Sequence, residues 1–231
     1  MWRKYRYVLL GAETEAEARR TGREGRGRML SQLRKCSKSL ERLKEVAKFL
    51  SGLPAIDTSL PIVIVAGPPN AGKSTFVSTV SSAKPEVAPY PFTTKSVIIG
   101  HAQVGGSVAQ VVDTPGLLDR DPSEMNEIER RAVAALRELP GAVIFLLDPT
   151  PAAALSVSEQ LRLLDRVMGW LGDRALVVAI NKVDAASEDT VKAVEEMARA
   201  RTPNVRTLVA YKKESAMEVL ESALEGLRSS P

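Results

Sequence analysis

Short runs of apolar residues, rich in valine and isoleucine, recur along most of this chain, with helical patterns between them. The runs lie at 62–66, 96–100, 107–113, 142–148, 175–181 and 205–210. The helical patterns lie at 72–82, about 123–138, 156–171, 188–201 and 214–228. Continuous apolar runs are typical of strands that are buried on both faces. The alternation therefore predicts an α/β fold in which helices cover both faces of a mostly parallel, six-stranded sheet.

Two of the expected strands are joined by a turn instead of a helix. Gly105 and Gly106 separate the runs that begin at 96 and 107. Paired glycines favour the tight turn of a β-hairpin because both turn residues adopt positive φ. We therefore expect one antiparallel strand at an edge of the sheet.

The beginning of the chain differs in charge from the rest. Residues 1–60 contain 14 Lys/Arg and 7 Asp/Glu, a net charge of +7, which leaves 32 − 14 = 18 basic and 28 − 7 = 21 acidic residues elsewhere, a net charge of −3. A basic segment of this kind favours a polyanionic partner, nucleic acid first and an acidic membrane second. The alternative is a solvated helix face with surplus arginine. We expect a basic helical segment at 1–58 and a second domain at 59–231.

Two helical patterns occupy this basic segment. Apolar residues between 29 and 50 recur at three- and four-residue spacing, and 13–20 is rich in helix formers. Gly22, Gly25 and Gly27 stand between the two patterns, and glycine weakens a helix. We therefore expect a short N-terminal helical hairpin.

The composition indicates a chain that works in a reducing, aqueous compartment. The sequence has no apolar run near 18 residues, so we expect no membrane span. The opening MWRKYRYVLLGAE lacks the small-residue cleavage pattern of a signal peptide. Cys36 is the single cysteine, so it has no partner for an internal disulfide. We expect a cytoplasmic monomer without a membrane partner.

The first expected strand runs directly into a glycine-rich loop, GPPNAGKST at 67–75, and a helix begins at its end. At this spacing the loop N–H groups bind phosphate oxygens, the lysine reaches the β and γ phosphates, and the next hydroxyl binds Mg²⁺. We therefore expect a nucleoside triphosphate here, with Lys73 as a catalytic residue and Ser74 as a Mg²⁺ ligand. The expected contacts are Gly67, Pro68, Asn70, Ala71, Gly72, Lys73, Ser74 and Thr75.

A second phosphate-binding element ends the strand at 107–113. The sequence there is DTPG, in which Gly116 follows Asp113 by three residues. An acid at the carboxyl end of a strand can hold Mg²⁺ through water, and the glycine N–H can reach the γ phosphate. Because Lys73 and Ser74 stand about 40 residues earlier, we expect Asp113 and Gly116 to complete a triphosphate site.

The sequence NKVD follows the strand at 175–181. Ligands of open α/β sheets bind at the carboxyl ends of strands. Asp184 is placed to accept hydrogen bonds from the N1–H and exocyclic amine of guanine, a donor pair that adenine lacks. Asn181 and Lys182 would brace the loop and cover the base. We therefore expect a guanine nucleotide, GTP or GDP.

The motifs together resemble a known family. GPPNAGKS, PYPFTTK, DTPGLLDR and NKVD stand in the order found in translation-factor-type GTPases. With IERRAVAALREL and FLLDPT, residues 28–228 resemble the nucleolar GTP-binding protein family of the Obg-like group, in its archaeal form. The resemblance implies a Mg²⁺-dependent GTPase in large ribosomal subunit assembly, with N-terminal helices that bind ribosomal RNA. Family members usually carry a longer helical domain before the GTPase domain than the segment present here.

The loop PYPFTTK at 89–95 precedes the second expected strand. A threonine hydroxyl here reaches Mg²⁺ only when the γ phosphate is present, which would make the loop a nucleotide-sensitive switch. The resemblance favours Thr94 as this Mg²⁺ ligand and catalytic residue, with Phe92 and Thr93 as nucleotide contacts. The alternative is an ordinary connecting loop.

The last base-contacting segment departs from the family pattern. A Ser-Ala-Lys type sequence is expected after the final strand, and Val209-Ala210-Tyr211 stands there instead. We expect these residues to border the base, with Ala210 contacting it through its backbone.

The residues expected to drive hydrolysis also depart from the common pattern. A glutamine that orients water often follows DTPG, and Leu117 occupies that position. The intrinsic rate should therefore be slow. In related GTPases an asparagine in the phosphate loop binds K⁺ in place of an arginine finger, so Asn70 is a candidate for K⁺-stimulated hydrolysis. The alternative is that Asn70 only caps the loop.

Two other functions stay open. One is a P-loop ATPase or nucleoside kinase, against which NKVD argues. The other is a module that holds GTP or GDP with little turnover, which Leu117 allows.

Overall fold

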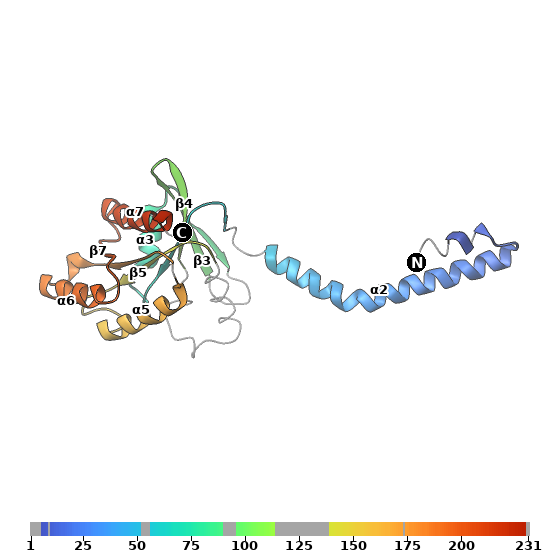
Figure 1. Ribbon diagram of the computed structural model, residues 1–231, viewed down its shortest axis with the longest axis horizontal. Helices are drawn as coiled ribbons and strands as arrows, with labels where there is room; N and C mark the ends of the chain where they lie inside the picture. Colours follow the sequence, from blue (N-terminus) through green and yellow to red (C-terminus); the bar gives the residue numbers. More distant parts are fainter. Residues whose placement is uncertain are drawn as a thin grey trace. The chain divides into compact units, whose positions relative to one another are not determined.

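A computed structural model describes residues 6–8, 10–51, 56–89, 96–113, 139–172 and 174–229 (Figure 1). The chain divides into two compact units, residues 1–51 and 52–231. The first unit is helical, and the second contains a sheet with helices. In the described part of the chain, no helix is both long and apolar enough to cross a membrane.

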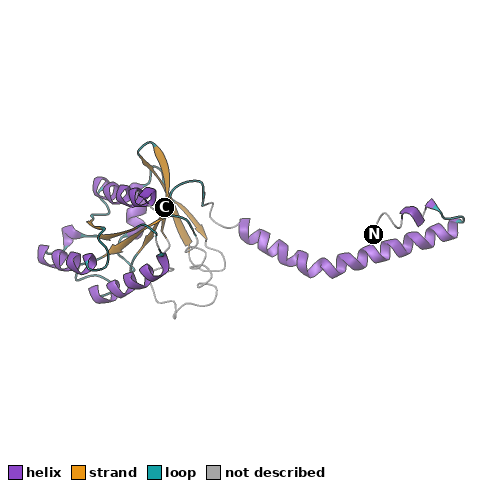
Figure 2. Cartoon of the chain, viewed as in Figure 1, coloured by secondary structure: helices purple, strands orange, loops and turns teal. Residues whose placement is uncertain are grey.

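The N-terminal unit contains one long helix where a helical hairpin was expected. Helix α2 extends over Glu15–Ser51, 37 residues (Figure 2), and residues 6–8 before it are also helical. The helix continues through Gly22, Gly25 and Gly27, so the prediction of a break there is wrong.

Local energetics explain why the glycines do not end the helix. A glycine inside a helix costs about 1 kcal/mol relative to alanine, which good helix formers on either side offset. Ion pairs at four-residue spacing also support the helix before and across the glycines. Arg19 is 2.6 Å from Glu15, and Arg20 is 3.3 Å from Glu24.

The second unit is built on seven strands instead of the expected six. They are β1 (Ile62–Ala66), β2 (Glu86–Pro89), β3 (Ser96–Val104), β4 (Ser107–Asp113), β5 (Ala142–Leu147), β6 (Leu176–Ile180) and β7 (Val205–Thr207). Their order in the sheet is β2-β3-β4-β1-β5-β6-β7. Strand β2 was not predicted from the sequence, because the segment Glu-Val-Ala-Pro is short, ends in proline and has no apolar run.

The sheet is parallel from β4 to β7, and β3 is antiparallel to both of its neighbours. The addition of β2 moves β3 one place inward from the edge. The predicted hairpin between β3 and β4 is confirmed, with Val104 paired to Ser107. Gly105 and Gly106 form its turn with φ values of 56° and 80°, which glycine adopts without a steric penalty.

The helices of this unit confirm most of the predicted helical patterns. They are α3 (Lys73–Val80), α5 (Val157–Leu171), α6 (Glu188–Arg199) and α7 (Lys213–Ser229), with a 3₁₀ turn, η2, at Val183–Ala185. The pattern at 123–138 lies outside the described residues. Two serines begin helices, since Ser156 caps α5 in a capping box with Glu159 and Ser187 caps α6.

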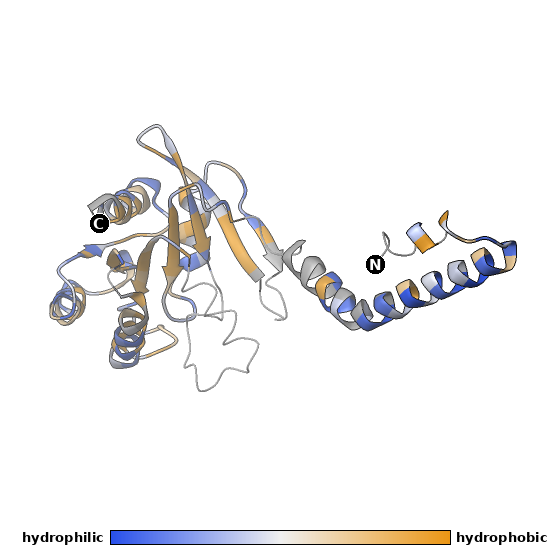
Figure 3. Cartoon of the chain, turned by 45° about the vertical axis from the view of Figure 1, so that its right-hand side comes forward, coloured by the Kyte–Doolittle hydropathy of each residue, from blue (hydrophilic) through white to orange (hydrophobic). Residues whose placement is uncertain are grey.

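The core lies in two layers, one on each face of the sheet. Side chains alternate along a strand, so Ile62 and Ile64 of β1 join a cluster with residues of α5 and α6. Val63 and Val65 join the opposite cluster, with residues of α3 and α7. Figure 3 shows the hydrophobic colour concentrated on the strands. Burial on both faces explains why these strands are continuous apolar runs.

The parallel strands bring their carboxyl ends to one edge of the sheet. β1 ends at Ala66, β4 at Asp113, β5 at Leu147 and β6 at Ile180. Each end continues into one of the motifs singled out in the sequence, so the sheet places those motifs side by side.

Candidate nucleotide-binding site

The glycine-rich loop connects β1 to α3 and depends on two glycines with positive φ. Gly67 has φ 139° and Gly72 has φ 100°. A Cβ on Gly67 would lie 2.6 Å from the backbone oxygen of Leu146, because the loop begins against β5. A Cβ on Gly72 would lie 2.3 Å from Nδ2 of Asn181. Only glycine fits at either place, which explains the spacing of the motif.

Lys73 is the first residue of α3, at the end of this loop, and is only 7% exposed. Its ammonium donates to the backbone oxygens of Gly67 and Pro68, at 2.9 and 2.8 Å. A buried ammonium needs such oxygen partners. The loop therefore concentrates a positive charge at the N-terminus of α3, where it adds to the partial charge of the helix.

Ser74 and Asp113 lie together, as the sequence predicted. The Ser74 hydroxyl donates to Oδ2 of Asp113 at 2.6 Å across 39 residues. The register of β1 with β4 makes this possible, since Val65 pairs with Asp113. A hydroxyl oxygen beside a buried carboxylate is the donor set that Mg²⁺ prefers, so these residues fit the ion that the motif implies.

Asn181 connects three segments that are distant in the sequence. Its Nδ2 donates to the backbone oxygen of Ala71 at 2.7 Å. Its Oδ1 accepts from the backbone N–H of Ala210 at 2.9 Å. The side chain is only 2% exposed. Asn181 therefore holds the phosphate loop, the end of β6 and the segment after β7 in one arrangement, in agreement with its predicted bracing role.

Lys182 is held by Asp148, which directly follows β5 and lies outside the NKVD motif. Its ammonium lies 2.5 Å from Oδ2 of Asp148, which is 2% exposed. The other oxygen of Asp148 accepts from the backbone N–H and hydroxyl of Thr150, at 2.9 and 2.7 Å. Lys182 has φ 58°, an uncommon conformation for a residue with a side chain. Asp148 thus shapes its own loop and also fixes Lys182.

Asp184, the expected base-reading acid, lies in η2 and is exposed. The hydroxyl of Tyr211 donates to its Oδ2 at 2.6 Å. This hydrogen bond and the negative charge of Asp184 raise the pKa of Tyr211 above the ordinary value of 10.0. The sequence marked Tyr211 as a neighbour of the base but carried no sign of this contact.

The backbone N–H groups of Ala210 and Tyr211 differ in their partners. Ala210 was expected to reach the base through its backbone, but its N–H donates to Asn181. The next N–H, that of Tyr211, makes no hydrogen bond within the described part of the chain. Val209 is buried, and its N–H donates to the Ser215 hydroxyl at 3.1 Å.

The remaining predicted residues fall into two groups. Asn70 and Thr75 are exposed on the phosphate loop and on the first turn of α3, and Asn70 has φ 61°. Phe92, Thr93, Thr94 and Gly116 lie outside the described residues, as does Leu117.

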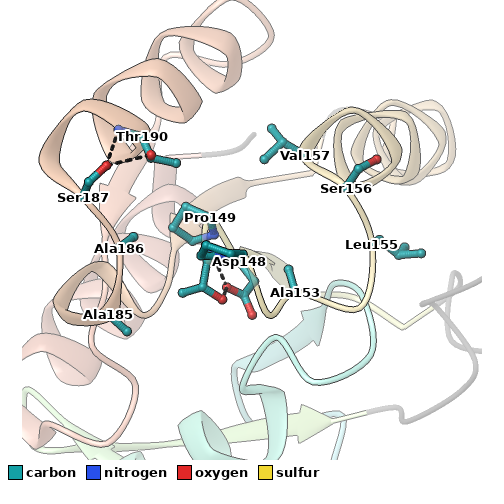
Figure 4. Close-up of a pocket in the computed structure, with 12 residues that line it drawn as sticks. Asp148, Pro149, Ala153, Leu155, Ser156, Val157, Ala185, Ala186, Ser187 and Thr190 are labelled. Atoms are coloured by element: carbon teal, nitrogen blue, oxygen red, sulfur yellow. Dashed lines mark hydrogen bonds between the residues drawn. The ribbon is translucent and has the colours of Figure 1, made fainter.

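A pocket of about 420 Å³ lies beside this site, away from the phosphate loop. Figure 4 shows that it opens between the loop from Asp148 to Val157 and the segment from Ala185 to Thr190. Asp148 belongs to its lining and also to the Lys182 ion pair.

Comparison with protein families assigns both units. Residues 62–182 match the family described as 50S ribosome-binding GTPase. Residues 2–57 match the NOG1 N-terminal helical domain.

Curated relatives agree with these matches. The chain is 36% identical over 182 residues to nucleolar GTP-binding protein 1 of Caenorhabditis elegans, which covers 79% of this chain and 27% of the relative. It is 29% identical over 233 residues to nucleolar GTP-binding protein 1 of Saccharomyces cerevisiae, which covers 99% of this chain and 36% of the relative. The chain therefore spans about a third of the length of these relatives.

Solved structures give the same fold. A crystal structure described as nucleolar GTP-binding protein 1 of Plasmodium falciparum superposes with a TM-score of 0.64 at 26% identity, covering 76% of this chain and 90% of that chain. The G domain of the T. maritima FeoB iron transporter gives 0.55 at 20% identity, covering 72% of this chain and 98% of that chain. The second likeness concerns the fold alone.

Proposed function

Because the chain belongs to the 50S ribosome-binding GTPase family, in its nucleolar GTP-binding protein 1 branch, we propose that it binds GTP and hydrolyses it to GDP and phosphate. The observation that carries the proposal is the meeting of Lys73, the Ser74–Asp113 pair and Asp184 along one edge of the sheet. We further propose that the nucleotide state switches a role in large ribosomal subunit assembly.

The loop from Gly67 to Lys73 would bind the phosphates. Lys73 donates to two loop carbonyls, so its ammonium can exchange them for β and γ phosphate oxygens without leaving the loop. Charge-assisted hydrogen bonds to phosphate are stronger than those to neutral carbonyls. Ser74 and Asp113 would hold Mg²⁺, which neutralises phosphate charge when bound.

Asp184 and the segment after β7 would recognise guanine. The carboxylate of Asp184 can accept from the N1–H and the exocyclic amine of guanine, and the Tyr211 N–H can donate to its O6. Adenine has an acceptor, N1, where guanine presents its N1–H to Asp184. It has a donor, its exocyclic amine, where guanine presents O6 to the Tyr211 N–H. A site built to hydrogen-bond one base rejects a base that leaves the donors and acceptors of the site unpaired.

The proposed reaction is attack of water on the γ phosphorus, with cleavage of the bond to the bridging oxygen. Lys73 stabilises the charge that develops on the phosphates. The test is single-turnover hydrolysis of GTP by the full chain and by Lys73→Ala. We expect a loss of about 100-fold or more in the variant. An unchanged rate in Lys73→Ala would place the activity elsewhere.

The same assay separates the other candidate functions. Tight ATP binding that Asp184→Asn leaves untouched would favour an ATPase or a nucleoside kinase. GTP binding by the wild type without turnover, even with K⁺ and RNA present, would favour a binding module.

K⁺ stimulation is the second part of the proposal. Asn70 is exposed on the phosphate loop, where its side-chain oxygen is accessible to a cation beside the phosphates. A cation beside the phosphates would replace the charge that an arginine finger supplies. We expect faster hydrolysis in K⁺ than in Na⁺, and no difference between the salts in Asn70→Ala. Equal turnover of the wild type in both salts would end this part of the proposal.

Binding to the large ribosomal subunit is proposed through the basic N-terminal segment. Helix α2 contains 11 Lys/Arg and 5 Asp/Glu, a net charge of +6, and several of its basic side chains are exposed. The match to an N-terminal helical domain of the same family supports this. The test is co-sedimentation with large-subunit particles in GTP, in GDP and without nucleotide. We expect pelleting that depends on GTP and weakens with salt, and failure to pellet in every state would refute the proposal.

A further inference from the structure

Tyr211 and Asp184 lie on two different backbone segments, and the structure holds each segment in place. Asp184 lies in the η2 turn, which follows β6 after Asn181 and Lys182. Tyr211 lies in a turn closed by the Lys212 N–H, which donates to the Val209 oxygen at 2.8 Å. Asn181 joins the two segments through Ala210. The framework that carries the nucleotide loops therefore holds both backbones where the Tyr211 hydroxyl lies 2.6 Å from Asp184.

The contact leaves the carboxylate able to bind a base. An ionised carboxylate offers about four lone-pair sites, and the Tyr211 hydroxyl occupies one of them on Oδ2. The N1–H and exocyclic amine of guanine need one site each. Tyr211 and guanine can therefore bind Asp184 at the same time.

The contact also limits how the carboxylate turns. The terminal torsion of an aspartate is broad, and an exposed Asp184 would rotate freely in water. A donor fixed on Oδ2 holds the plane of the group before the nucleotide arrives. Groups that are oriented in advance lose less entropy when they bind.

Given the guanine site proposed above, on which this role depends, we propose that the Tyr211 hydroxyl is a positioning group that orients Asp184 for two-point recognition of guanine. The Tyr211 hydroxyl is protonated and able to donate at neutral pH, since the ordinary pKa of tyrosine is about 10 and Asp184 shifts the pKa of Tyr211 further upward. Tyr211 therefore determines specificity through Asp184, in addition to the contact that its backbone makes.

Inosine nucleotides distinguish this role from a general structural one. Hypoxanthine retains N1–H but lacks the exocyclic amine, so it makes one hydrogen bond to Asp184 where guanine makes two. The orientation of the carboxylate affects two bonds for GTP and one for ITP. Loss of the hydroxyl should therefore reduce GTP affinity more than ITP affinity.

The experiment measures the dissociation constants of GTP, ITP and ATP for the full chain by calorimetry. We expect Tyr211→Phe to weaken GTP binding by about 3- to 10-fold, to weaken ITP binding less, and so to reduce the preference for GTP over ITP. Tyr7→Phe, which alters an exposed tyrosine outside the GTPase domain, should change neither constant. An equal loss for GTP and ITP in Tyr211→Phe would overturn the proposal.

Two further variants separate the hydroxyl from the ring. Tyr211→Leu should match Tyr211→Phe, and a loss confined to Tyr211→Leu would overturn the proposal in favour of ring packing. In an Asp184→Ala background, adding Tyr211→Phe should cost nothing more, because the cycle isolates the pair. An additional loss there would also overturn it.

The result for the wild type tests the proposed function separately. A wild type that binds GTP no better than ATP refutes guanine recognition and this role with it. A wild type that prefers GTP, with an unchanged GTP-to-ITP ratio in Tyr211→Phe, refutes only the role of the hydroxyl.

Discussion

Lys182 takes its position from a buried acid outside its own motif. Asp148 binds Lys182 with one oxygen and organises the Thr150 turn with the other. Because Asp148 is 2% exposed and Lys182 is 35% exposed, the pair is half desolvated. Removing one partner of such a pair costs more free energy than the formation of the pair contributes, because the other charge is then buried without a partner.

We predict that Asp148→Asn lowers the free energy of unfolding by about 1–2 kcal/mol and weakens GTP binding. Asparagine keeps an acceptor for Thr150 but turns an amide toward the Lys182 ammonium, so two donors face each other. Urea unfolding and nucleotide titration measure the two effects.

The matched control is Asp165→Asn, which breaks the surface pair with Arg201 at 2.7 Å. Exposed pairs contribute little, so this change should cost at most about 0.5 kcal/mol and leave GTP binding intact. Equal effects from both variants would contradict the role given to Asp148.

Tyr211 should titrate later than an ordinary tyrosine. The hydrogen bond to Asp184 and its charge raise the folded-state pKa above 10.0. The pair therefore contributes to stability below the unfolded-state pKa, and the contribution is lost as the pH rises through the folded-state pKa. Ultraviolet difference titration of the wild type against Tyr211→Phe isolates this group. In Asp184→Asn its pKa should fall toward the ordinary value, and an unshifted pKa in the wild type would contradict the contact.

At the scale of elements, the phosphate loop illustrates how a local motif serves tertiary packing. Gly72 has a positive φ and also lies against Asn181, whereas Gly106 in the β3–β4 turn has a positive φ with open space around it. Both glycines therefore need a positive φ, but only at Gly72 would an added Cβ also meet a neighbouring side chain.

We predict that Gly72→Ala abolishes measurable GTP binding and destabilises the fold by more than Gly106→Ala. The new Cβ at Gly72 would lie 2.3 Å from Nδ2 of Asn181, so the bonds of Asn181 to Ala71 and Ala210 must break. Gly106→Ala should cost about 1 kcal/mol from backbone strain alone and leave binding unchanged. Binding assays with thermal unfolding check both, and similar binding by the two variants would refute this view of Gly72.

Elements also differed in how well the sequence predicted them. The buried strands and the Gly105–Gly106 hairpin follow from local patterns and were predicted. Strand β2 was missed because it forms only by pairing with β3. The continuity of α2 through its glycines was missed because a local propensity of about 1 kcal/mol per glycine is small beside the support of a long helix.

At the scale of the whole molecule, charge separates the two units. The basic residues of α2 suit a phosphate backbone, whereas residues 61–231 carry a net charge of −3. The RNA binding that we propose for α2 should therefore depend strongly on salt, because each neutralised phosphate releases counterions.

We predict that changing four exposed basic residues of α2 to glutamine reduces the salt slope of RNA binding by about three, at 0.7–0.9 per phosphate contact. The residues are Arg34, Lys35, Arg42 and Lys44. Filter binding to large-subunit ribosomal RNA over a range of KCl concentrations gives the slope.

The matched control changes four exposed basic residues of the GTPase domain and should leave the slope unchanged. The residues are Lys84, Arg162, Lys192 and Arg206. An equal fall in both sets would mean that the whole surface, and not α2, attracts the RNA.

The sequence by itself determined the order of the motifs, the parallel sheet and the division of charge, because strand burial, glycine loops and charge are local properties. Only the tertiary structure decided which side chains meet. Asn181 reaches Ala71 across 110 residues, Lys182 reaches Asp148 across 34 and Tyr211 reaches Asp184 across 27. These contacts depend on the order and register of β1, β5, β6 and β7, which no local pattern encodes.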